Sequence, residues 1–223
     1  MRSHHQKRII LSVLGFLTVA LPLKAVDVQD TKFLTQPAIS RTRIAFVYAN
    51  DLWVADLDGR NVRRLTTDLG IESVPSFSPD GAAIAFSGQY DGNTDVYIIP
   101  AAGGVPKRLT WHPSLDIVQG FAPDGKAILF ASQRQTSSNR YLQLFTVPVE
   151  GGFPEMLKIP QAYRAAFSPD GTKIAYNPNA DAFLQWKGYR GGLNSVVWIV
   201  KMDDLSLEKI PQPEGRSNDP NPM

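Results

Sequence analysis

Short apolar runs fill the chain from about residue 31 onward, and clusters of Gly, Pro, Asn and Asp separate them. The runs are rich in β-branched and aromatic residues, which is typical of strands. Some runs are apolar at every position, for example Val96–Ile99, as expected of a strand that is buried on both faces. No amphipathic helical stretch of useful length follows residue 25, so the pattern predicts an all-β fold.

A turn motif recurs three times at nearly constant spacing. From position 77 to 121 is 44 residues, and from 121 to 167 is 46 residues, which is close to the period of a four-stranded propeller blade. Within each copy, Pro fixes φ, Asp can bond its own backbone, and Gly supplies a positive φ, so each copy predicts a tight hairpin. The three copies are Phe77–Gly81, Phe121–Gly125 and Phe167–Gly171.

The repeats predict a β-propeller with four antiparallel four-stranded blades that do not complete a ring. In the first blade a degenerate segment, Ser40–Arg43, stands where the turn motif is expected. We expect the second blade to begin with a strand at Val74–Ser78 and each blade to end with a strand of about five residues. Residues 211–223 are interpreted as a linker into a fifth blade. The four blades are expected at about residues 31–66, 74–110, 118–159 and 163–210.

Residues 1–25 have the layout of a secretory signal peptide. A basic start precedes an apolar run, Ile9–Leu21, that is too short for an ordinary membrane span of about 20 residues. We expect cleavage after Ala25 and export to the periplasm or the medium of a bacterium; an uncleaved membrane anchor is the alternative. No Cys follows the run, which excludes a lipoprotein anchor.

The charge of the remaining chain does not favour nucleic acid as a partner. The first 25 residues carry four basic residues and no acid, so the rest has 19 basic and 21 acidic residues. The basic pI of the whole chain therefore comes from the signal segment. The chain has no Cys, so its stability must come from packing rather than disulfides.

Few residues suggest catalysis or metal binding. After the signal, His112 is the single histidine, and Ser114 lies too close in sequence for the usual geometry of a nucleophile and its base. One histidine without cysteine also disfavours zinc. The segment Asp91–Asp95 resembles the start of a calcium loop, but Val96 and Ala102 replace the required Gly and Glu. We expect no catalytic residues, no metal and no cofactor.

A long insertion, Asn177–Asn194, interrupts the fourth repeat. Long loops inside compact repeats are often functional. Cations beside aromatic rings could hold a peptide carboxylate. In the alternative interpretation, the aromatic residues pack over the blade and the cations are solvated. The candidate binding residues are Trp186, Lys187, Tyr189 and Arg190.

Several motifs resemble the propeller repeats of the TolB family and of tricorn-type serine peptidases. They include the Pro-Asp-Gly turns and the Arg-Leu-Thr endings at Arg64–Thr66 and Arg108–Thr110. Two segments favour tricorn: Asn50–Trp53 is similar to its first blade, and Trp186–Gly192 is similar to the fourth blade of its six-bladed propeller. The resemblance covers about residues 30–223.

The resemblance implies that this chain is the non-catalytic N-terminal propeller segment of an exported serine peptidase. It implies four blades of a six-bladed ring, peptides or protein as partners, and a homo-oligomeric parent that channels or filters peptides. The alternative is a stand-alone periplasmic propeller of the TolB type that binds another protein. The only membrane contact expected is that of the signal segment before cleavage.

Overall fold

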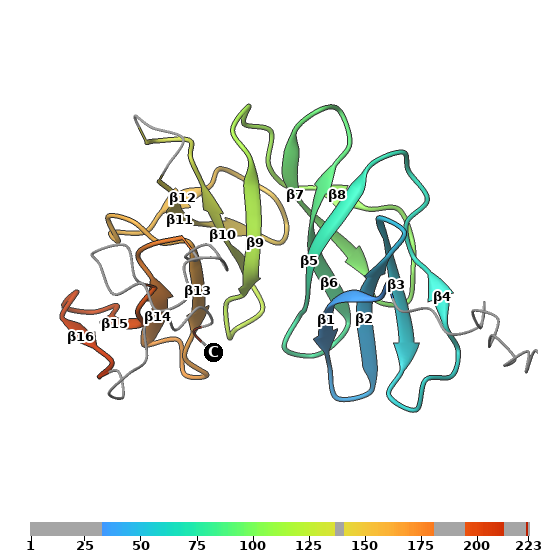
Figure 1. Ribbon diagram of the computed structural model, residues 1–223, viewed down its shortest axis with the longest axis horizontal. Helices are drawn as coiled ribbons and strands as arrows, with labels where there is room; N and C mark the ends of the chain where they lie inside the picture. The colour runs from blue at the N-terminus through green and yellow to red at the C-terminus, as the bar shows by residue number, and fades with distance from the viewer. Residues whose placement is uncertain (1–32, 137–140, 181–194, 212–221, 223) are drawn as a thin grey trace, which may run out of the picture. The chain divides into compact units, whose positions relative to one another are not determined.

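The computed structural model describes residues 33–136, 141–180, 195–211 and 222, and these residues form strands and turns without helices. The strands make four separate sheets. Each sheet has four antiparallel strands whose spatial order follows the chain, as in a propeller blade (Figure 1). The predicted fold class, an all-β incomplete propeller, is confirmed.

Each blade runs from an inner first strand to an outer fourth strand in chain order. Blade 1 contains β1 (Thr35–Ile39), β2 (Arg43–Tyr48), β3 (Asp51–Asp56) and β4 (Arg63–Arg64). Blade 2 contains β5 (Ile71–Phe77), β6 (Ala83–Gln89), β7 (Thr94–Pro100) and β8 (Lys107–Arg108). Blade 3 contains β9 (Asp116–Phe121), β10 (Ala127–Ser132), β11 (Gln143–Pro148) and β12 (Glu155–Met156). Blade 4 contains β13 (Arg164–Phe167), β14 (Lys173–Asn177), β15 (Trp198–Lys201) and β16 (Leu207–Lys209).

The inner strand of blade 2 and the outer strands of all four blades differ in length from the prediction. The inner strand β5 begins at Ile71, three residues before the predicted start at Val74, because its first residues pair with the end of β6. The outer strands have two or three residues instead of about five. In blade 1 the β3–β4 ladder is short because the hydroxyl of Thr66, and not a backbone carbonyl, accepts the N–H of Leu52.

In blades 2 and 4 a serine holds the Pro-Asp-Gly turn, whereas the copy in blade 3 has Ala122 at that position. In blade 2, the Ser78 hydroxyl accepts the Ala83 N–H at 2.9 Å and donates to the Asp80 carboxylate at 2.6 Å. The bond from the Ser78 hydroxyl and a second bond from the Ala82 N–H, at 2.9 Å, hold the pKa of the Asp80 carboxyl below its usual value. Gly81 has a φ of 73°, the left-handed conformation that this position requires. The same bonds recur in blade 4.

The degenerate turn of blade 1 keeps the serine and loses the rest of the motif. The hydroxyl of Ser40 accepts the N–H of Arg43 at 3.0 Å and donates to the Arg43 carbonyl. A serine at this position therefore closes the hairpin without Pro, Asp or Gly after it.

The cores lie between the blades. Adjacent residues of β7 face opposite neighbours: Tyr97 packs in the cluster shared with blade 1, and Val96 packs in the cluster shared with blade 3. A third cluster joins blades 3 and 4. These clusters explain why strands such as β7 are apolar on both faces.

Polar contacts between blades have a consistent direction. Arg63 on β4 donates to the carbonyl of Ala101 in blade 2 at 2.6 Å. At the equivalent position of the next blade, Lys107 donates to the carbonyl of Glu150 in blade 3 at 2.8 Å. In both pairs the earlier blade supplies the donor side chain and the later blade supplies a hairpin carbonyl.

The described residues contain no helix that is long and apolar enough to cross a membrane. The predicted signal peptide, residues 1–25, and the insertion residues 181–194 lie outside the described ranges. Most of the predicted linker after residue 211 also lies outside them.

Candidate functional site

The two ends of each sheet differ in their connections. Because neighbouring strands are antiparallel, the Pro-Asp-Gly turns and the outer hairpins lie at one end, here called the turn end. The connections between second and third strands, and between one blade and the next, lie at the opposite end, called the loop end. The loop-end connections inside the blades lengthen along the chain from two residues (49–50) to four (90–93), ten (133–142) and twenty (178–197). Long connections of this kind often carry function.

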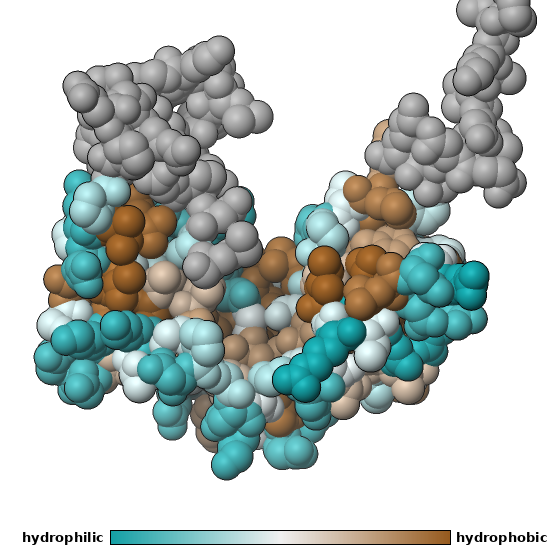
Figure 2. Space-filling view, turned by 90° about the horizontal axis from the view of Figure 1, so that it is seen from below, coloured by the Kyte–Doolittle hydropathy of each residue, from teal (hydrophilic) through white to brown (hydrophobic). Residues whose placement is uncertain are grey.

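A cavity of about 800 Å³ opens where the inner strands of the four blades meet loop-end segments. This volume lies in the range of about 300–1,000 Å³ that is common for ligand sites. Most of its wall is apolar, and the space-filling view shows a hollow with hydrophobic residues on its inner sides (Figure 2). The lining residues are Gln36, Pro37, Val74, Pro75, Ile117, Val118, Gln119, Leu142, Tyr163, Arg164, Ala165, Ala180 and Pro222.

Two residues of the cavity wall have strained backbones. Gln36 has a φ of 52° and Val74 has a φ of 50°, and each precedes a proline that also lines the cavity. A β-branched residue with positive φ is rare. Both residues lie at breaks in strand register, so each inner strand bulges at the same place. Backbone strain of this kind is concentrated at functional sites in proteins.

Side chains of the preceding blade cap the inner strands along the cavity. The Val74 N–H donates to the side-chain oxygen of Gln36, and the Ala165 N–H donates to that of Gln119 at 3.0 Å. The Val118 N–H donates to the hydroxyl of Ser87 at 2.8 Å. An exposed strand edge can recruit another strand. These caps occupy donors that an added peptide strand would otherwise use.

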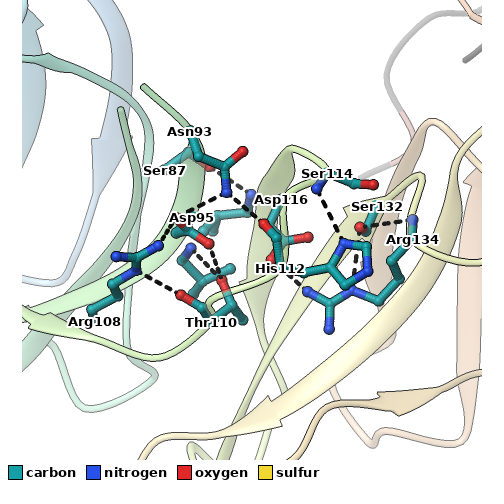
Figure 3. A network of polar contacts seen from close by, with 12 residues as sticks. Ser87, Asn93, Asp95, Arg108, Thr110, His112, Ser114, Asp116, Ser132 and Arg134 are labelled. Atoms are coloured by element: carbon teal, nitrogen blue, oxygen red, sulfur yellow. Dashed lines mark hydrogen bonds and ion pairs between the residues drawn. The ribbon is translucent and has the colours of Figure 1, made fainter. Parts of the chain in front are cut away.

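The Arg-Leu-Thr motif is a junction between the third and fourth strands. In blade 2, Arg108 contacts Asp95 at 2.6 Å, and the Thr110 hydroxyl accepts the Val96 N–H at 2.9 Å (Figure 3). Leu109 is fully buried. Blade 1 repeats the junction with Arg64 and Asp51 at 2.7 Å. The motif therefore serves the blade itself rather than a ligand.

His112 and Ser114 are brought together, but not as a catalytic pair. The Ser114 backbone N–H donates to His112 Nδ1 at 3.1 Å, so the ring carries its proton on Nε2 (Figure 3). The contact does not involve the serine hydroxyl. Asn93 donates to the His112 carbonyl at 2.5 Å, which ties this loop to the connection before β7.

The calcium-like segment of blade 2 is engaged by a cation. Arg108 contacts Asp95 at 2.6 Å and Asp91 at 3.6 Å, so a guanidinium lies between the two carboxylates. Burial raises the pKa of Asp95, and the Arg108 charge opposes this shift. Among the described residues, no group of three or more His, Cys, Asp or Glu side chains is placed to hold a metal ion.

A buried ion pair anchors the ten-residue connection of blade 3. Arg134 contacts Asp116 at 2.5 Å, and its guanidinium lies 5.0 Å from the ring centre of Phe130 and 5.1 Å from that of Phe145 (Figure 3). Sequence reasoning missed this pair, because its members are 18 residues apart and lie on different strands or loops. The four insertion residues predicted to bind peptide, Trp186, Lys187, Tyr189 and Arg190, lie outside the described residues and stay a prediction.

Comparison with known proteins identifies the family. Residues 31–223 match the tricorn protease N-terminal beta propeller domain, so the chain belongs to this family of propellers. Tricorn protease homolog 1 of Streptomyces coelicolor is 32% identical over 167 residues, which are 75% of this chain and 16% of that relative. The chain spans about a fifth or less of the curated relatives that it matches over most of its own length.

Solved structures agree with the family and with the wider resemblance. The crystal structure of the tricorn protease has a TM-score of 0.70 and 28% identity, and covers 83% of this chain and 18% of its own. TolB from Acinetobacter baumannii has a TM-score of 0.64 and 25% identity, and covers 79% of this chain and 43% of its own. The predicted resemblance to tricorn-type propellers is thus confirmed.

Proposed function

We propose that this chain is the non-catalytic N-terminal propeller segment of an exported tricorn-type serine peptidase and that it guides peptides through its central cavity. The parent would be a homo-oligomer whose catalytic residues lie outside this segment. The observation that carries the proposal is the cavity of about 800 Å³, because inner strands of all four blades line it. The relatives that support the proposal are proteases by name.

The capped inner strands also favour a peptide that passes through the cavity rather than one that pairs permanently with an inner strand. A peptide could pair with an inner strand only through backbone N–H groups of that strand. Three such N–H groups, one in each of blades 2, 3 and 4, already donate to side chains. A peptide in the cavity would therefore meet mainly side chains, which favours passage over tight capture.

A peptide-binding measurement tests the proposal. The probe is the hexapeptide Ala-Gly-Ala-Val-Phe-Leu with fluorescein on its N-terminus, titrated with the full chain and followed by anisotropy. Pro37→Trp places a bulky ring at an exposed position of the cavity wall and should weaken binding about tenfold, because it obstructs the space that the peptide needs. Val105→Trp adds the same ring at the turn end, where Val105 is 89% exposed, and should leave binding unchanged.

A stand-alone TolB-type propeller is the second candidate, and the structural likeness to TolB favours it. Its ligand would be a folded protein rather than a peptide. Equal peptide affinities for the wild type, the Pro37→Trp variant and the Val105→Trp variant would contradict passage through the cavity and leave this second candidate. The genomic sequence after the Met223 codon separates the two further, because only the first predicts catalytic domains there.

A further inference from the structure

Two glutamines cap inner strands along the cavity, and they differ in the donors that they leave over. Gln119 accepts the Ala165 N–H at 3.0 Å, and its own amide nitrogen donates to the Ile117 carbonyl at 3.3 Å. Gln36 accepts the Val74 N–H through its side-chain oxygen in the same way. Within the part of the chain that the structure describes, no group accepts a hydrogen bond from the Gln36 amide nitrogen.

The bond to Val74 determines which way the Gln36 amide faces. A backbone N–H is a donor, so it must meet the oxygen of the side-chain amide and not the nitrogen. The nitrogen therefore presents two N–H donors at the cavity wall, which Gln36 lines as an exposed residue. Because the bond already restricts the side chain, a ligand that accepts from it has less conformational freedom to remove.

The backbone at Gln36 also suggests a binding role. Its φ of 52° is uncommon for a residue other than Gly, and the register of β1 breaks between Thr35 and Ala38. Bulges of this kind often redirect a side chain next to a site. Pro37 adds apolar surface to the same wall. A neutral donor beside apolar surface suits a ligand that combines uncharged acceptors with apolar groups, as a peptide does.

We propose that the side-chain amide of Gln36 donates a hydrogen bond to a main-chain carbonyl of a peptide in the cavity. Every peptide carries such carbonyls, so this contact orients a peptide without selecting its side chains. The inference rests on the proposed function, since it assigns a peptide-contacting residue to the same cavity.

The Gln36→Glu variant tests the donor while it keeps the cap. Glu has nearly the same shape as Gln, and its carboxylate still accepts the Val74 N–H, but it has no N–H to donate. The probe is the amide of Ala-Gly-Ala-Val-Phe-Leu with tetramethylrhodamine on its N-terminus, so that neither end adds a net charge. Titration with the full chain is followed by anisotropy. We expect the variant to bind the probe about fivefold more weakly than the wild type.

Two further variants separate the donor from charge and from stability. Thr35→Glu places the same charge on the neighbouring exposed residue and should leave the affinity within about twofold of the wild type. Gln36→Met removes the acceptor together with the donors. It should weaken binding about as much as Gln36→Glu and also lower the melting temperature, because the Val74 N–H loses its partner. A wild-type melting temperature for Gln36→Glu verifies that the cap is kept.

Ester peptides identify the group that accepts the bond. In each of them a single main-chain amide of the probe is replaced by an ester, whose carbonyl is a weaker acceptor. We expect one ester to weaken binding to the wild type about threefold and to have a smaller effect on Gln36→Glu and Gln36→Met, in which this hydrogen bond is already lost. The N–H that the ester lacks is missing in all three titrations and cancels in the comparison.

The outcomes separate this inference from the proposed function. Equal affinity of the wild type and Gln36→Glu for the probe would overturn the inference and leave peptide passage standing. If Thr35→Glu weakens binding as much as Gln36→Glu does, the effect is one of charge and the inference is wrong. If Gln36→Glu binds more weakly but no ester is coupled to residue 36, the acceptor is not a main-chain carbonyl and the inference is again wrong. If the probe does not bind the wild type, the proposed function fails and the inference fails with it.

Discussion

Replacing Thr110 with Val removes one buried hydroxyl at nearly constant shape. Thr110 is 1% exposed. Its hydroxyl accepts the Val96 N–H at 2.9 Å and donates to the Asp95 carboxylate at 3.3 Å. In the Thr110→Val variant the Val96 N–H has no acceptor, whereas the carboxylate keeps its contact with Arg108 at 2.6 Å.

The free energy of unfolding should fall by roughly 2–3 kcal/mol in this variant. A buried donor or acceptor that loses its partner costs about 1–3 kcal/mol. The amide is expected to account for most of the loss, and the weaker bond to Asp95 for the remainder. Urea unfolding followed by circular dichroism measures the total, and hydrogen exchange of the Val96 amide reports the junction itself.

A matched variant separates this effect from the general cost of exchanging Thr for Val. Thr67→Val makes the same exchange at an exposed loop position and should change stability by less than about 0.5 kcal/mol. A Thr110→Val variant that unfolds within that margin of the wild type, with unchanged exchange at Val96, would refute the assignment of the Arg-Leu-Thr motif to a structural junction.

Two further predictions follow from burial and from the N-terminal segment. Burial raises the pKa of Glu72 above 4.5, so the wild-type protein loses stability as pH rises from about 4.5 through the folded-state pKa of Glu72. Gln at this position carries no charge, so the Glu72→Gln variant should become more stable relative to wild type above about pH 4.5. Parallel stability–pH curves for the two proteins would contradict this. We predict that the signal is cleaved, so that protein recovered from cells begins at Val26, as Edman degradation can show; an intact Met1 would count against a cleaved signal.

The repeating features were predictable because local chemistry fixes them. A Pro-Asp-Gly turn specifies its own hairpin, and strands apolar on both faces require neighbours on both sides. Even the degenerate turn of blade 1 follows this logic once the bonds of Ser40 are known. These features depend on residues that are close in sequence or on a pattern that the repeats share.

The cavity and its wall could not be predicted in the same way. The positive φ of Val74 runs against the preference of a β-branched residue, and neighbouring strands impose it. Nothing in the sequence distinguishes Arg164 from other exposed residues, and only the arrangement of the inner strands brings it into the cavity wall. The candidate residues singled out from sequence were aromatic and cationic groups in the insertion, because composition marks such clusters and cannot mark a wall assembled from four blades.

The direction of the contacts between blades has a consequence for synthesis. Gln36 and Gln119 each accept an N–H from the following blade, and Arg63 and Lys107 each reach forward to a later hairpin. A ribosome releases the chain from its N-terminus, so each of these side chains emerges before the backbone group that it will bond. When a new blade emerges, the side chains that will bond it are therefore already present on the preceding blade, and the blades can assemble one at a time in the order of translation.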